Sequence, residues 1–207
     1  GWSISGVGSC SRCSSKRAID GISKGGSYGA GDKFCLNGQR LILESGQYGN
    51  EGSEYRLEIN TNQRVVASGF QYGAPESFKV YSPDGRIFEY GGSADSRVEI
   101  QNQDKVNLWA RNRITDLAGN YIRFDYHEDN ESGEFYPLAV AYTGNDQQQL
   151  EPYNHLSFEY EGRSDPFFSC INGGLSQTAV KLKSVKIFKH VPNDSLDSAG
   201  DSKLFRK

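Results

Sequence analysis

Four cysteines are the residues whose type and spacing most directly suggest chemistry. They are Cys10, Cys13, Cys35 and Cys170 in a chain of 207 residues. Cys10 and Cys13 have the spacing of one arm of a zinc site, but structural zinc sites usually combine two closely spaced pairs of ligands. Cys35 and Cys170 each stand alone, and the segment around the first pair holds no histidine. The pattern therefore disfavours zinc.

Disulfide bonds are the use of these cysteines that we favour. A redox-active Cys-x-x-Cys needs a βαβ setting, which the surrounding sequence lacks. Four cysteines allow three pairings. We prefer Cys13 with Cys35, because each lies beside a glycine-rich turn and both flank one loop, and we leave Cys10 and Cys170 to pair or to stay free. Such bonds imply an oxidising compartment.

Other candidate sites have the right residue types but the wrong spacing. The three histidines, His127, His155 and His190, are scattered, and none belongs to a His-Glu-x-x-His metalloprotease motif. The acidic stretch 127–134 lacks the alternation of ligands and spacers of a calcium-binding EF-hand loop, so we expect a solvated hairpin loop. Residues 1–6 lack the Gly-x-Ser-x-Gly spacing of a serine hydrolase.

The remaining enzyme signals are equally weak. The glycine-rich stretch 23–33 has Asp32 after Gly31 where a phosphate loop needs Lys and then Ser or Thr, so a flexible surface loop is expected. Trp2 and Trp109 could stack on sugars, but tryptophan is more often found in cores or interfaces. Nothing singles out a catalytic pair among the 26 acidic residues. The sequence predicts no catalytic residue, no metal site and no cofactor.

Composition indicates a folded, turn-rich protein made of strands. The chain has 12 Tyr, 11 Phe and 24 Gly, whereas disordered chains lack aromatic residues. Its net charge of -3 and the lack of a basic patch argue against nucleic acid as a partner, and its apolar runs are too short to insert into a membrane. It contains no Met, so we expect an internal fragment of a longer protein, and the absence of a signal peptide says nothing about secretion.

Alternating patterns and turn signals predict roughly ten or more short antiparallel strands, of the usual five or six residues, and no helix. Asn37-Gly38 is a strong hairpin signal. In residues 53–60, Tyr55, Leu57 and Ile59 are expected to share the buried face. Within 178–190 the apolar residues change phase, which a β-bulge near Ser184 would repair.

The chain divides into three regions by composition. Residues 1–33 are glycine- and serine-rich and are predicted to be irregular, residues 34–190 form the β domain, and residues 191–207 are predicted to be a loose polar tail.

One sequence pattern occurs twice along the β domain. Residues 81–92 contain the turn Pro83-Asp84-Gly85 followed by a strand, and residues 116–127 again place a glycine before a strand. In both, an aromatic residue follows the glycine by five positions, Tyr90 in the first and Phe124 in the second. A repeated strand-turn-strand unit cannot bury its own face, so neighbouring units must stack on one another.

Longer stretches resemble a known family. Residues 113–145 resemble a degenerate YD/RHS repeat, with Ile114-Thr115-Asp116, Gly119-Asn120 and Tyr142-Thr143-Gly144-Asn145. Residues 1–6 followed by 10–13, then 32–59 and 76–91, are similar to the SpvB-type N-terminal domain, which occurs in the B components of insecticidal Tc toxin complexes and in related RHS proteins. The resemblance runs from Gly1 to about Lys189.

The resemblance implies a fold and a role. Strand-turn-strand repeats would form part of a curved β-sheet shell that encapsulates a toxic C-terminal polypeptide of a secreted virulence protein. The segment itself would be non-enzymatic, since an ADP-ribosyltransferase, where the family has one, lies in a separate domain whose motifs are absent here. Its partners would be neighbouring repeats of the parent chain, the toxin C component and the A-component pore. Cys13 and Cys35 are common in the family, whereas Cys10 and Cys170 look additional.

Two other functions remain open on the residues alone. A free-standing β-sandwich could bind glycan or protein on an aromatic surface, and a carbohydrate-active enzyme would need two carboxylates about 5 to 9.5 Å apart. A shell segment taken out of its parent should instead self-associate or show a long unpaired strand edge.

Overall fold

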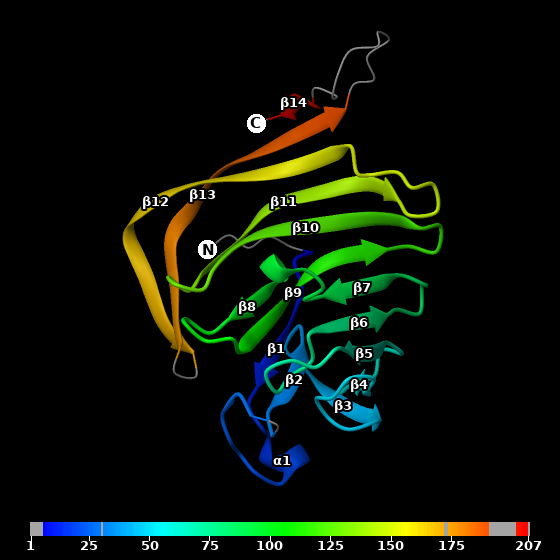
Figure 1. Ribbon diagram of the computed structural model, residues 1–207, viewed down its shortest axis with the longest axis vertical. Helices are drawn as coiled ribbons and strands as arrows, with labels where there is room; N and C mark the ends of the chain where they lie inside the picture. The colour runs from blue at the N-terminus through cyan, green and yellow to red at the C-terminus, as the bar shows by residue number, and fades with distance from the viewer. Residues whose placement is uncertain (1–5, 30, 172–173, 191–201, 207) are drawn as a thin grey trace.

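Strands, almost all of them paired antiparallel, are the dominant secondary structure of the computed structural model, as the sequence predicted (Figure 1). The structure describes residues 6–29, 31–171, 174–190 and 202–206. The strands are β1 (Ser9–Cys13), β2 (Lys33–Leu36), β3 (Gln39–Ser45), β4 (Glu54–Leu57), β5 (Arg64–Ser68), β6 (Ser77–Tyr81), β7 (Ile87–Tyr90), β8 (Arg97–Glu99), β9 (Val106–Thr115), β10 (Asn120–Asp129), β11 (Glu134–Asn145), β12 (Asn154–Ile171), β13 (Gly174–His190) and β14 (Ser202–Arg206).

Part of the sheet closes on itself. Strands β1 to β7 follow one another in order, β7 pairs with β9, and β9 pairs back with β1 to complete a ring. Strand β9 is the junction, because its first half pairs with β1 and β8 and its second half with β7 and β10. From β10 the sheet continues outward through β11, β12 and β13 to β14 (Figure 1).

The ring is filled by aromatic side chains. Phe34, Phe78 and Trp109 meet edge to face with centroids 5.2 to 5.5 Å apart, and each is at most 2% exposed. Tyr55 is also fully buried, and its hydroxyl accepts a hydrogen bond from the Gly49 amide. Burying each such side chain stabilises the fold by about 1.5 to 3 kcal/mol, so this cluster is a main source of stability for the ring.

The repeated sequence pattern forms turns that stack on each other. Gly85 and Gly119 occupy the same place in their turns, with φ of +81° and +78°. A Cβ atom on Gly85 would lie 2.5 Å from the Leu117 side chain, so the first turn touches the second. The Asp146 amide donates to the Gly119 carbonyl at 2.9 Å, which adds a third turn to the column. Tyr90 and Phe124, which occupy matching positions after these glycines, are both buried.

Several local predictions are confirmed. Asn37 and Gly38 both have positive φ and join β2 to β3, with Leu36 opposite Gln39. The predicted bulge is present in β13, because Ser184 lies opposite Glu159 while Leu182 lies opposite Tyr160, so one residue is left over.

Other predictions are wrong in detail. The segment 1–33 is not wholly irregular, because it contributes β1. The sequence of β1 has no hydrophobic alternation, so no strand was predicted there. It also contains a one-turn helix, α1 (Arg17–Asp20), and a 3-10 helix, η1 (Ala94–Ser96), lies before β8, although no helix was expected. Ile59 is 67% exposed because β4 already ends at Leu57.

Strand lengths and the tail differ as well. Strands β12 and β13 have 18 and 17 residues, far longer than expected. Residues 191–201 of the predicted loose tail lie outside the described residues, but β14 within that tail pairs with β13. Among the described residues, no helix is long and apolar enough to cross a membrane.

Candidate functional site

Cys13 and Cys35 form a disulfide bond, the pairing preferred from the sequence. The bond crosses the β1–β2 pair diagonally, because Cys13 lies opposite Lys33 and Cys35 opposite Ser11, and the two Cα atoms are 5.9 Å apart. The tentative pair of Cys10 with Cys170 does not form. Both are free, since Cys10 packs inside the ring, where burial raises its pKa, while Cys170 is exposed on β12.

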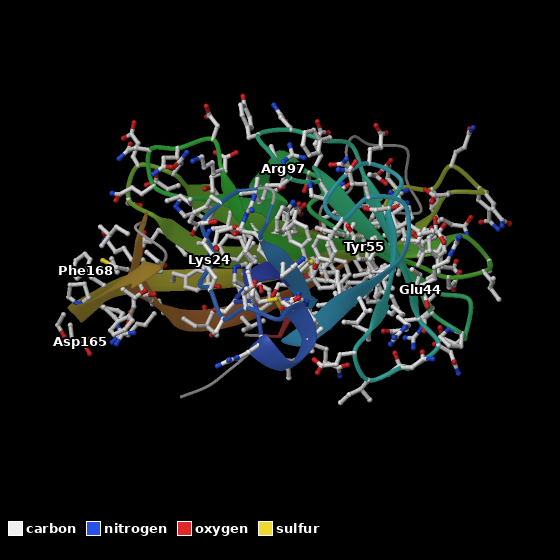
Figure 2. All side chains as sticks on the ribbon, turned by 90° about the horizontal axis from the view of Figure 1, so that it is seen from below. Lys24, Glu44, Tyr55, Arg97, Asp165 and Phe168 are labelled. Atoms are coloured by element: carbon white, nitrogen blue, oxygen red, sulfur yellow. A yellow bond between two sulfur atoms is a disulfide. The ribbon has the colours of Figure 1, made fainter. Side chains whose placement is uncertain are left out.

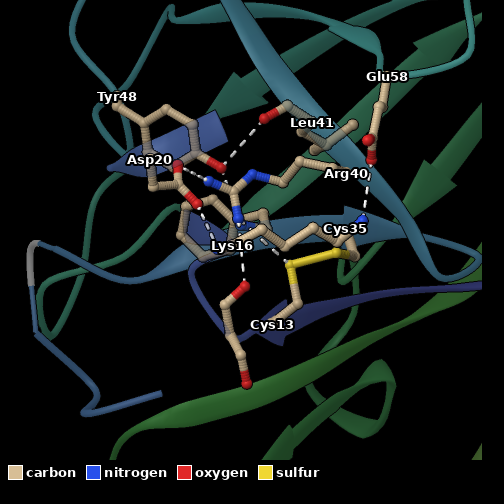
Figure 3. A network of polar contacts seen from close by, with 10 residues as sticks. Cys13, Lys16, Asp20, Cys35, Arg40, Leu41, Tyr48 and Glu58 are labelled. Atoms are coloured by element: carbon tan, nitrogen blue, oxygen red, sulfur yellow. Dashed lines mark hydrogen bonds and ion pairs between the residues drawn. A yellow bond between two sulfur atoms is a disulfide. The ribbon is translucent and has the colours of Figure 1, made fainter. Parts of the chain in front are cut away.

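An ionic network surrounds the disulfide (Figure 3). The Arg40 guanidinium lies 3.9 Å from the Cys13 sulfur and donates to Asp20 at 2.5 Å. Both side chains are shielded from water, at 2% and 9% exposed. Asp20 also accepts a hydrogen bond from the Lys16 amide, which closes the turn of α1. The disulfide and this ion pair together hold the segment between Cys13 and Cys35 against the outer side of β1, β2 and β3.

A second buried ion pair lies on the inner side of β1. The Arg12 side chain is 0% exposed, donates to Asp32 at 3.0 Å and donates to the Val106 carbonyl at 2.7 Å. Three rings surround its guanidinium at 5.3 to 5.9 Å, those of Tyr28, Phe34 and Trp109. Burial raises the pKa of Asp32, but hydrogen bonds from Ser27 and from Arg12 outweigh that effect and hold it below its usual value. The pair joins the segment before β2 to the core.

The histidines and the acidic loop have structural surroundings. His127 stacks on Tyr136 and His155 stacks on Phe188, with centroids 4.6 and 4.5 Å apart. The side chain of His190 lies outside the described residues. The acidic stretch 127–134 spans the end of β10 and the turn into β11, where Asp129 accepts hydrogen bonds from Glu131 and Ser132. Within the described ranges, no three metal-binding side chains gather around one point.

Two neighbouring carboxyl groups, those of Glu99 and Glu128, have raised pKa values. Burial, and then the charge of Asp104, raises the pKa of Glu99, and burial, followed by the charge of Glu99, raises the pKa of Glu128. Glu99 borders two cavities, of about 160 and about 210 Å³, and both are small for a sugar. Trp109 is fully buried and cannot stack on a ligand, and Trp2 lies outside the described residues.

An apolar cavity forms where the β12–β13 ribbon separates from β11. Strand β12 pairs with β11 only through residues 154–157, which lie opposite residues 139–142. The ladder stops there because Pro137 has no N–H to continue it. The Pro137 carbonyl is satisfied instead by the Tyr160 hydroxyl at 2.7 Å.

The ribbon then bends and returns to β11. Its register jumps between Gly162 and Phe167, where a stretch ending in Pro166 opposes a single residue of β13. Strand β13 meets β11 again at Gln177, opposite Glu134. The return is close: a Cβ atom on Gly133 would lie 2.3 Å from the Leu175 carbonyl oxygen.

Between these two contacts lies a cavity of about 590 Å³. Its walls include Phe135, Tyr136, Pro137, Tyr160, Val180 and Leu182. The rings of Tyr136 and Tyr160 are 4.4 Å apart, and Glu134 is the charged residue of the lining. Burial, followed by the nearby Tyr136, raises the pKa of Tyr160 to about 12, so its hydroxyl stays protonated at neutral pH. The site offers apolar surface and hydroxyl groups, which suits binding of an apolar group.

Sequence reasoning missed this cavity, although a signal was present. Pro137 and Pro166 both lie inside stretches that otherwise resemble strands, and proline inside a strand marks an edge or a bulge. The bend itself projects from the body, and Figure 2 shows Asp165 and Phe168 at this end of the molecule, away from Tyr55 in the ring. Phe167 and Phe168 are 61% and 54% exposed there.

Comparison with solved structures identifies the class of fold. The chain matches the structure of TcdB2-TccC3 with Cdc42 at a TM-score of 0.73 and 17% identity, over 96% of this chain and 12% of that one. It matches the N-terminal domain of the effector SpvB from Salmonella typhimurium at 0.72 and 16% identity, over 95% of this chain and 79% of that one. It matches the Tc holotoxin pore of Photorhabdus luminescens at a TM-score of 0.75 and 16% identity, over 96% of this chain and 12% of that one.

These matches show that the chain has the SpvB/Tc toxin-type fold that its sequence resembled. It spans about an eighth of the TcdB2-TccC3 chain but most of the SpvB domain. No protein-family model matches the chain, and no curated protein sequence matches it significantly.

Proposed function

We propose that the chain is a non-enzymatic structural segment of a secreted RHS/Tc-type toxin or virulence protein, and forms part of a β-shell that encapsulates a C-terminal toxic polypeptide. The observation that carries this proposal is the arched sheet beyond the ring. The ribbon of β12 and β13 is apolar on the face that lines the cavity and charged on the other, as a wall between an enclosed space and solvent would be. Proteins of the same fold include the Tc assemblies.

The partners follow from the same proposal. Neighbouring repeats of the parent chain would continue the sheet, and the toxin C component and the A-component pore would complete the assembly. A disulfide is most often retained in an oxidising compartment, which supports an extracellular location.

Electron microscopy of the full-length parent protein tests the proposal. An antibody fragment raised against the projecting bend at 163–166 would mark this segment, since Asp165 is largely exposed there. The expected result is a hollow particle with the label on its wall. A compact particle without an internal space, with the label on a separate lobe, would contradict an encapsulating role.

The apolar cavity favours a second candidate, a binding module. Tyr136 and Tyr160 could hold a glycan ring or an apolar side chain by stacking. This module would be built on a closed ring of strands, not on the two packed sheets of a sandwich. Saturable glycan binding that Tyr136→Ala abolishes, in a parent that forms no shell, would favour it.

A further inference from the structure

One edge of β13 carries an unpaired stretch of backbone. Its first edge pairs with β12 along most of its length. On its second edge the Gln177 amide donates to Gly133, and the Ala179 amide donates to the Glu134 carboxylate at 2.7 Å. Farther along the same edge β13 pairs with β14, whose last residue, Arg206, lies opposite Ile187. From 180 to 186, no strand of the described part of the chain pairs with this second edge.

The edge is able to accept a strand. Strand β14 already lies on it, antiparallel to β13, with Arg206 opposite Ile187. The open stretch continues directly from that pairing, and unpaired strand edges are templates for further pairing. A strand placed there would lie in the space between β14 and the return contact of β13 with β11.

The two faces of this edge differ in chemistry. Val180 and Leu182 line the cavity, although Leu182 is also 43% exposed, and the exposed Lys181 and Lys183 alternate with them in sequence. Strand β12 shows which sequence suits such a neighbour, because Glu161 pairs with Lys181 at 3.2 Å and Glu159 pairs with Lys186. Lys183 forms no ion pair with any described residue, so it is left for a partner on the open side.

We propose that the open edge of β13 binds one further strand, antiparallel to β13, in which apolar residues alternate with acidic ones. The apolar residues extend the cavity wall, and the acidic residues lie beside Lys181 and Lys183. This inference rests on the proposed function, because it names the kind of segment by which the shell continues. A second copy of β13 is disfavoured, since lysines would face lysines across the new pair.

A peptide that copies β12 is a direct probe. Residues 155–162, HLSFEYEG, have the required alternation and already pair with β13 on its other side. We expect the labelled peptide to bind this chain with a change in fluorescence anisotropy, and a version with lysine in place of both glutamates to bind about tenfold more weakly, because opposite charges across strands attract and like charges repel. Hydrogen exchange locates the site: binding should slow exchange of the Lys181 amide, two residues beyond Ala179 on the same edge.

A charge reversal tests the pairing from the other side. Lys183→Glu should weaken binding of the acidic peptide and strengthen binding of the lysine peptide, while Lys24→Glu, an exposed lysine in the segment before β2, should change neither. Circular dichroism checks that each variant is folded.

Several results would overturn the inference: no peptide binding, equal binding of both peptides, binding unaffected by Lys183→Glu, or edge-to-edge dimers of the chain in sedimentation. Its failure is distinguishable from failure of the proposed function, because peptide binding is measured on this chain alone. If the parent protein forms a hollow particle but this chain shows no preference between the two peptides, the proposed shell function stands. Only the proposed strand partner of β13 is then excluded.

Discussion

Asp32→Asn tests whether the buried charge of Arg12 needs its counterion. The change preserves the shape of the side chain but removes its negative charge. With the Arg12 side chain 0% and the Asp32 side chain 3% exposed, water cannot replace the lost partner. Removing one member of a buried ion pair typically costs about 3 to 5 kcal/mol, so we expect a large loss in the free energy of unfolding.

The surroundings of Arg12 place the expected loss near the lower end of that range. The guanidinium keeps its hydrogen bond to Val106 and its three aromatic neighbours at 5.3 to 5.9 Å. These contacts are the same in the variant, where the guanidinium is therefore not left wholly without partners. A loss of about 3 kcal/mol is a large part of the roughly 5 to 15 kcal/mol that stabilises most domains.

Urea unfolding followed by tryptophan fluorescence and by circular dichroism measures the loss. Asp125→Asn is the matched control, because Asp125 forms an ion pair with Arg123 at a similar distance, 3.1 Å, but both side chains are exposed. The control should cost less than about 1 kcal/mol. If Asp32→Asn cost no more than this control, the buried pair would not stabilise the fold as argued.

Acidity provides an independent check on the same pair. The pKa of Asp32 is lowered in the folded state from its usual 3.8, so the stability it contributes is present above that pH and is lost as the pH falls through the folded-state pKa. The difference in unfolding free energy between the native chain and Asp32→Asn should therefore narrow below that pH. If that difference in unfolding free energy did not change with pH, the effect of Asp32→Asn would come from packing and not from the lost charge.

Three further variants test the disulfide, the return of the ribbon and the cavity. Cys13→Ser, or reduction of the native chain, opens a loop with a sequence separation of 22 and should cost about 3 kcal/mol in urea unfolding; an unchanged midpoint would contradict this. Gly133→Ala should cost clearly more than Gly38→Ala, because both have positive φ but only the first places a Cβ atom against backbone, 2.3 Å away; equal midpoints would refute the close return. Tyr160→Phe removes the hydrogen bond to Pro137 and should cost about 1 kcal/mol; no loss would mean that this bond does not support the arch.

The features that sequence predicted well are those set by local chemistry. The Asn37-Gly38 turn needs two residues that tolerate positive φ, and the phase change before Ser184 needs an extra residue, so both could be read without knowing the fold. The two repeated turns could be predicted in the same way, because Gly85 and Gly119 both supply the positive φ that such a turn requires.

The features it missed depend on contacts between distant segments. Strand β1 has little alternation of its own and is a strand because β2 and β9 pair with it from both sides. Arg12 would be expected on a surface, yet its burial is made possible by Asp32 and by rings from other parts of the chain. The cavity arises from Pro137 on one strand and Pro166 on another, and their combined effect appears only when the strands are side by side.

The ring and the ribbon have different requirements, and variants should separate them. Every strand of the ring has neighbours on both edges, so its stability depends on internal contacts such as that of Arg12 with Asp32. Strand β13 has an open stretch of edge, so Lys183 there affects the choice of partner and not the fold. We therefore expect Asp32→Asn to lower the unfolding free energy without changing the preference between the two peptides, and Lys183→Glu to do the reverse. A single variant that changed both quantities would mean that the ribbon and the ring are one cooperative unit, and that the edge is part of what holds the ring together.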